Sequence, residues 1–99
     1  MTARSCVELI FDATCPNVDA ARGQLREALS LAGRPLRWTE WDRAASDTPR
    51  QALRYASPTI LVDGRDVADG GTLDAGSGCR IRTPSAQMIL AALVATEHA

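Results

Sequence analysis

The 99-residue chain contains no lysine, few aromatic residues and no long apolar run. Without lysine, no Schiff-base or other lysine-based catalysis is available. Lysine and arginine together number 11, against 12 acidic residues, and the formal net charge is -1. Because the two signs are mixed along the chain rather than gathered in blocks, composition predicts neither nucleic-acid binding nor attraction to a charged membrane surface.

Apolar segments are short, and none approaches the about 20 residues that a membrane span requires. The polar start, Met1 to Arg4, is too short for a signal peptide. We therefore expect a cytoplasmic protein with no membrane segment. A hydrophobic content of 45% is typical of a globular chain, and the length predicts one domain over residues 1–99.

Cysteines are few as well. They stand at positions 6, 15 and 79, an odd number with no pair at zinc-finger spacing. This excludes a disulfide scaffold and predicts no structural metal. Cys6 belongs to the apolar run 6–11, so we interpret it as a small core residue.

Cys15 lies in the turn between that apolar run, a predicted buried strand, and a segment from Pro16 to about Ala32 with helical spacing of its apolar residues. Pro16 suits a first helical turn, since its missing amide would be unpaired there. Cys15 is then expected at a helix N-terminus, where backbone amides and the helix dipole favour a thiolate. The alternative is a partly buried, inert thiol.

The remaining elements follow in order. Residues 36–42 predict a second strand, whose two tryptophans are expected to pack against the core. The later elements are a short helix over 50–55, a strand over 59–62, an Asp63-Gly64 hairpin turn leading to a strand over 65–69, a glycine-rich loop over 70–82, and a final helix after Thr83-Pro84.

Three short motifs stand at key junctions of this order: Cys15-Pro16 at the first helix start, Ser57-Pro58-Thr59 before the third strand, and Gly70-Gly71 after the last strand. Together they resemble the thioredoxin-like superfamily, in particular glutaredoxin-sized members with a single-cysteine Cys-Pro-x-Val motif. The resemblance implies an α/β fold, a three-layer sandwich with a four-stranded mixed sheet (β-α-β-α-β-β-α) and helices on both faces.

The same resemblance implies site residues. Cys15 would be the exposed nucleophile. Pro58, if cis, would turn the backbone of Ser57 toward Cys15 so that a thiol or peptide could pair with it. The implied substrate-binding residues are Pro16, Ser57, Pro58, Thr59, Gly70 and Gly71. The two glycines would leave room for a glutathione-like ligand, and no other cofactor is expected.

This sequence departs from the family pattern at two positions. Val18 stands where the second cysteine of the motif would be, and Asp12 lies before Cys15, where glutaredoxins usually carry a basic residue. Cys79, in the glycine-rich loop, is the natural substitute for the missing partner. We expect it to resolve a mixed disulfide formed on Cys15.

The leading hypothesis is thus a thiol–disulfide oxidoreductase that uses Cys15 and Cys79, acting on a thiol or disulfide substrate that is either a small molecule or a protein. A second hypothesis is a soft-metal or thiol-ligand binding protein that uses the same two sulfurs. A third is a redox-inactive thioredoxin-like interaction module. The sequence leaves the electron donor and the oligomeric state open.

Overall fold

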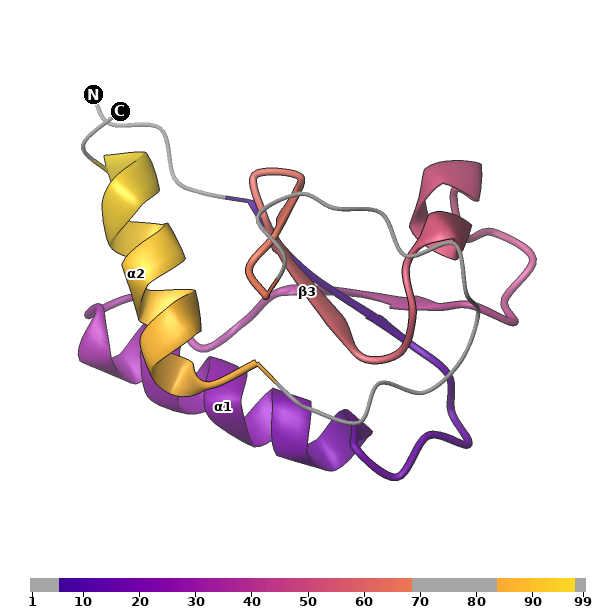
Figure 1. The fold of residues 1–99 in the computed structure, drawn as a ribbon, viewed down its shortest axis with the longest axis horizontal. Helices are drawn as coiled ribbons and strands as arrows, with labels where there is room; N and C mark the ends of the chain where they lie inside the picture. Colours follow the sequence, from indigo (N-terminus) through magenta and orange to yellow (C-terminus); the bar gives the residue numbers. More distant parts are fainter. Residues whose placement is uncertain (1–5, 69–83, 98–99) are drawn as a thin grey trace.

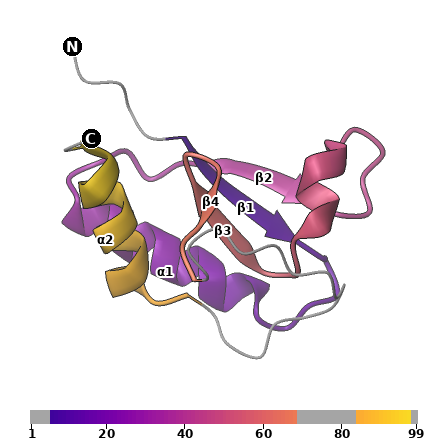
Figure 2. The ribbon, with the colours of Figure 1, turned by 45° about the horizontal axis from the view of Figure 1, so that its top comes forward.

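The computed structural model describes residues 6–68 and 84–97 of the chain. Its elements are β1 (Val7–Phe11), α1 (Val18–Leu31), β2 (Thr39–Asp42), the 3-10 helix η1 (Arg50–Arg54), β3 (Thr59–Val62), β4 (Arg65–Asp66) and α2 (Ala86–Glu97). The strands form one sheet in the order β2-β1-β3-β4 (Figures 1 and 2). β1 is parallel to β2 and antiparallel to β3, and β3 is antiparallel to β4. The predicted four-stranded mixed sheet is confirmed.

The two faces of this sheet are covered differently. Both α-helices pack on one face, against a core that includes Leu9 and Ile60 (Figure 2). On the other face, Ile10 and Leu61 pack against η1. The short helix predicted over residues 50–55 is therefore a five-residue 3-10 helix, and it is what covers the second face of the sheet.

Prolines explain the short length of η1. Pro49 precedes it with extended backbone, at φ -59° and ψ 146°, and Tyr55 returns to extended backbone at ψ 147°. Pro58 follows shortly after, and the residue before a proline is pushed away from helical angles. Only one short helical segment fits between these two breaks.

Helix α1 forms because its apolar residues recur on one side. Its buried residues are Val18, Ala21, Leu25, Ala28 and Leu29. The helix ends as predicted at Gly33, which has a φ of +69°. The Gly33 amide donates to the Ser30 carbonyl at 3.1 Å and the Arg34 amide to the Leu29 carbonyl at 2.9 Å, which is the Schellman arrangement.

The start of α2 also depends on side chains. The Ser85 hydroxyl accepts a hydrogen bond from the Met88 amide at 3.2 Å, and Gln24 of α1 accepts one from the Ala86 amide at 2.7 Å. Ser85 therefore caps the helix. In the part of the chain that the structure describes, neither α-helix is both long and apolar enough to cross a membrane.

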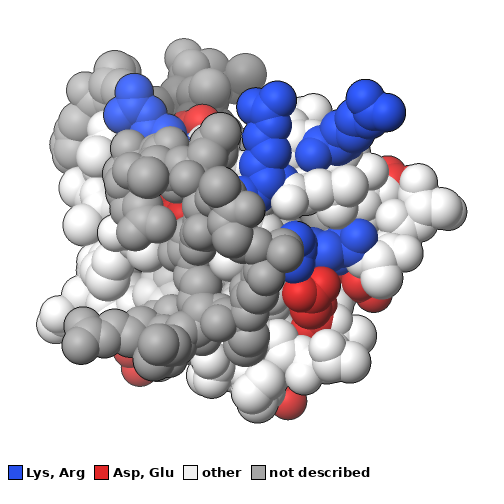
Figure 3. All heavy atoms as spheres, turned by 45° about the vertical axis from the view of Figure 1, so that its right-hand side comes forward, with Lys and Arg blue, Asp and Glu red and all other residues white. Residues whose placement is uncertain are grey.

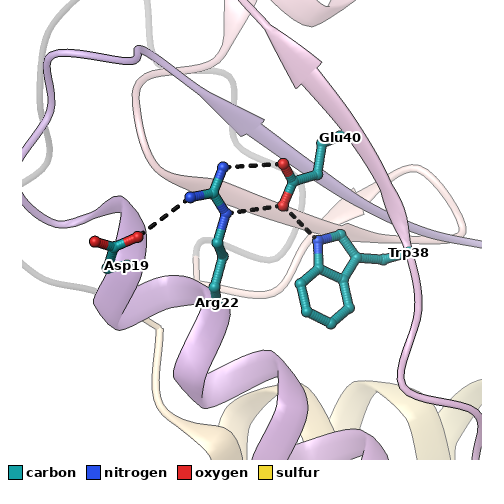
Figure 4. Close-up of polar contacts among 4 residues, drawn as sticks. All are labelled: Asp19, Arg22, Trp38 and Glu40. Atoms are coloured by element: carbon teal, nitrogen blue, oxygen red, sulfur yellow. Dashed lines mark hydrogen bonds and ion pairs between the residues drawn. The ribbon is translucent and has the colours of Figure 1, made fainter.

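An ion-pair network ties α1 to the edge strand β2 (Figure 4). Arg22 donates two hydrogen bonds to the Glu40 carboxylate, at 2.9 Å and 3.0 Å, and a third to Asp19 at 3.2 Å. The Trp38 indole donates to Glu40 at 3.0 Å. Trp38 and Trp41 both pack against the core, as predicted.

We expect this network to stabilise the fold only above acidic pH. The hydrogen bonds from Arg22 and Trp38 hold the pKa of Glu40 below its ordinary value. A carboxylate whose pKa is lowered by folding contributes stability above its unfolded pKa of about 4.3 and loses that contribution as the pH falls through the folded pKa. Glu40→Gln should lower the free energy of unfolding by about 1 kcal/mol at pH 7, and this difference should shrink below about pH 4.

Urea unfolding of the parent and the variant at pH 7 and at pH 3 measures this difference. Glu27→Gln is the matched control, because Glu27 is exposed on the same helix α1. A Glu40→Gln effect that is equally large at both pH values would mean that the carboxylate charge is not what stabilises the contact.

Candidate functional site

Three chain segments meet at one end of the sheet. Phe11 pairs with Asp42 at the ends of the parallel strands β1 and β2, and Ile10 of β1 pairs with Thr59 at the start of β3. The turn after β1, the turn after β2 and the segment before β3 are therefore neighbours. Cys15 lies in the first of these turns.

Cys15 is nearly buried, with 8% of its surface exposed, and its sulfur is part of a disulfide. The partner sulfur lies outside the described residues, since Cys6 is a free thiol. The Cys15 amide donates to the Asp12 carbonyl at 2.9 Å, and the Cys15 carbonyl accepts from the Val18 amide at 3.4 Å. Both bonds fix the backbone of this turn.

The helix begins later than the sequence suggested. Its first residue is Val18 and its N-cap is Asn17, so Cys15 precedes the cap instead of standing in the first helical turn. The reason is that the chain first closes a turn between Cys15 and Val18. Because the effect of a helix end on charge is confined to the first turn, it is weaker at Cys15 than expected.

Ser57 approaches Cys15 from the segment before β3. Its carbonyl oxygen lies 3.7 Å from the Cys15 Sγ, and the Ser57–Pro58 peptide bond is cis, as predicted from the sequence. In a disulfide the sulfur carries no proton, so this is a packing contact. In the reduced protein, a Cys15 thiol would face this carbonyl as a hydrogen-bond acceptor.

Polar contacts connect Cys15 and Ser57 with Asp12 and Arg43. The Asp12 amide donates to the Ser57 hydroxyl at 2.9 Å, and Arg43 donates to the Asp12 carboxylate at 2.8 Å. The Arg43 amide also donates to the Phe11 carbonyl at 2.8 Å. On the side of the molecule that carries η1, basic and acidic side chains lie next to one another (Figure 3).

Sequence reasoning missed Arg43, although a signal for it existed. Asp12 and Arg43 each follow directly after one of two neighbouring parallel strands. The carboxyl ends of parallel strands lie at the same edge of a sheet, so opposite charges at these two positions are placed to pair.

The other predicted site residues divide into three groups. Pro16 is exposed beside Cys15. Ser57, Pro58 and Thr59 are completely or almost completely buried, and the Thr59 hydroxyl donates to the Ala56 carbonyl at 2.5 Å. In this structure the segment therefore offers neither its side chains nor its backbone to solvent. Cys79 and the pair Gly70-Gly71 lie outside the described residues.

The prediction that Cys6 is a small core residue is wrong, because the residue is exposed. It precedes β1, and the Asp63 turn pins it there. The Cys6 amide donates to the Asp63 carboxylate at 2.7 Å, and the Asp63 amide donates to the Cys6 carbonyl at 2.8 Å. Although the residue is exposed overall, partial desolvation of its sulfur raises the pKa of the Cys6 thiol, and the charges of Glu8 and Asp63 raise it further.

Cys6 should therefore alkylate slowly at neutral pH in the folded protein. A raised pKa leaves less of the reactive thiolate at pH 7, and the alkylation rate should still be rising above about pH 8.5, the pKa of an unperturbed thiol. Iodoacetamide labelling followed by peptide mass spectrometry measures the rate at each pH. The urea-unfolded protein is the control, and a plateau below pH 8 in the folded protein would contradict the expectation.

The chemistry of this end of the sheet centres on one sulfur and its polar neighbours Asp12, Arg43 and Ser57. A sulfur in a disulfide can accept attack by a thiolate, and the resulting thiol can later give its electrons back. Among residues 6–68 and 84–97, no group of three or more His, Cys, Asp or Glu side chains is arranged to hold a metal ion.

No family model matches the chain, and neither a curated protein nor a solved structure matches it.

Proposed function

We propose that the protein exchanges thiols and disulfides through Cys15, with Cys79 as the second sulfur. The observation that carries this proposal is the difference between the two described cysteines. Cys15 is disulfide-bonded, whereas Cys6 is free. The sequence contains one further cysteine, Cys79, and we propose it as the second sulfur.

The exchange balances without a cofactor. In the reduced protein, the Cys15 thiolate attacks a substrate disulfide, forms a mixed disulfide and releases one substrate thiolate, which takes up a proton. The Cys79 thiolate then attacks the Cys15 sulfur and releases the second substrate thiolate. Two electrons pass from the protein dithiol to the substrate, and a thiol reductant returns the protein to its starting state by the reverse steps.

The surroundings of Cys15 limit how a reactant can reach its sulfur. With 8% of the residue exposed, one small part of it is open to a reactant. The Ser57 carbonyl, 3.7 Å from the Cys15 Sγ, belongs to a buried residue, so a reactant would have to reach the sulfur itself. A small thiol such as glutathione and an exposed cysteine of a protein segment both satisfy this description.

Mapping the linked cysteines tests the proposal. The fully reduced protein is mixed with one equivalent of a small aromatic disulfide, the released thiol is measured, and the protein is digested without reduction for mass spectrometry. We expect two aromatic thiols released per protein, a Cys15–Cys79 link, and an unmodified Cys6. A stable adduct on Cys6, or no thiol release, would contradict the proposal.

A further inference from the structure

The Asp12–Arg43 ion pair occupies the base of the turn that carries Cys15. The Arg43 guanidinium lies 2.8 Å from the Asp12 carboxylate, and the two side chains are 13% and 31% exposed. Asp12 also contributes both of its backbone groups to the site: its amide bonds to Ser57 and its carbonyl accepts from the Cys15 amide. Displacing Asp12 would therefore move both Ser57 and the backbone of Cys15.

The charge of Asp12 matters as much as its position. A carboxylate close to a cysteine disfavours the thiolate, whereas a guanidinium favours it. Among the described residues, Asp12 lies in the Cys15 turn directly after β1, Arg43 directly after β2, and Asp19 in the first turn of α1. Asp19, in the first turn of α1, is 94% exposed and paired with Arg22, so solvent screens it strongly.

A buried donor marks Arg43 as unusual. Its Nε atom is buried and has no hydrogen-bond partner among the described residues. Such a group costs stability, and each instance in a folded protein calls for an explanation. The pairing with Asp12 holds the guanidinium in this place in spite of that cost.

We propose that Arg43 is a positioning residue that neutralises the Asp12 carboxylate beside Cys15 and, through Asp12, holds the Cys15 turn against Ser57. The biological purpose of this role rests on the proposed thiol exchange. The electrostatic effect of the ion pair on Cys15 does not require the protein to catalyse exchange. The pair sets how much of Cys15 is ionised at a given pH. Loss of either charge should therefore change the reactivity of Cys15, and the two losses should act in opposite directions.

The pH profile of Cys15 alkylation tests this role. The reduced full-length protein is treated with iodoacetamide from pH 5 to pH 10, and mass spectrometry follows the Cys15 peptide alone. The variants are Asp12→Asn, Arg43→Met, Arg43→Lys and the double variant Asp12→Asn with Arg43→Met. Arg65→Met is the matched control, because β3 places Arg65 beside Val62 at the opposite end of the sheet.

Asp12→Asn should move the midpoint of the profile down by about one pH unit, and Arg43→Met should move it up by about the same amount. The double variant, Arg43→Lys and Arg65→Met should all stay close to the parent. Because Asp12→Asn keeps the side-chain shape, it tests the charge even if Arg43→Met fails to fold.

Shifts of the same sign in Asp12→Asn and Arg43→Met, or no shift in Asp12→Asn, would overturn the proposal. A purely structural role predicts such same-sign changes. Because alkylation needs no substrate disulfide, this result stands whether or not the protein catalyses exchange. The failure of one proposal can therefore be told from the failure of the other.

Discussion

Replacing Cys15 by serine should abolish disulfide exchange, leaving only the uncatalysed reaction of the substrate with the reductant. A serine hydroxyl does not attack a disulfide, because the reaction needs a thiolate as nucleophile. The substitution changes one atom at a nearly buried position, so the fold should be retained. Reduction of a small disulfide by the protein in the presence of excess thiol measures the loss.

Two companion variants separate the roles of the cysteines. Cys79→Ser should keep the first attack by Cys15 but accumulate the mixed disulfide, which mass spectrometry detects as an adduct on Cys15. Cys6→Ser should turn over like the parent, because the Cys6 thiol has a raised pKa and lies before β1. Full activity in Cys15→Ser would rule out the proposed exchange.

The disulfide of Cys15 should also be the largest single contribution to the stability of the oxidised protein. If Cys79 is its partner, the bond closes a loop that contains most of the domain. Restricting such a loop in the unfolded chain is worth about 3–4 kcal/mol. Since a domain of this size is stabilised by about 5–15 kcal/mol, reduction should produce a clear drop in the urea midpoint.

Unfolding in urea with and without a thiol reductant measures this contribution. The reduced parent and the Cys15→Ser variant should unfold at similar urea concentrations, both well below the oxidised parent. Cys6→Ser is the control and should respond to reductant as the parent does. An oxidised parent that is no more stable than its reduced form would show that the disulfide does not constrain the unfolded chain.

The sequence predicts the elements of this fold better than their lengths. Periodic apolar residues place α1 correctly, and Gly33 and Asp63-Gly64 stand at positive φ values as their positions suggest. Strand lengths are harder to predict, because pairing partners decide them. β2 begins at Thr39 rather than at residue 36, and β4 ends at Asp66. Neither limit follows from local composition.

The site, like the fold, was predicted from the sequence only in part. The contact between Cys15 and Ser57 was expected from the resemblance alone, and the structure gives it a distance of 3.7 Å. The place of Cys15 relative to the helix was not, because a turn closing on Val18 competes with an immediate helix start. Arg43 was not predicted as a site residue, because its position beside Asp12 depends on which strand lies next to β1. That is a property of the sheet rather than of any local pattern.

The separation of Cys15 and Ser57 along the chain has a consequence during synthesis. Ser57 follows Cys15 by 42 residues, and the strand that positions it pairs with β1 only across that distance. At typical rates of translation, the cysteine exists for roughly 2–8 seconds before its neighbour has been made. During that interval the cysteine lacks the Ser57 carbonyl that contacts its sulfur in the folded protein. Only the completed sheet gives this sulfur its distinct surroundings.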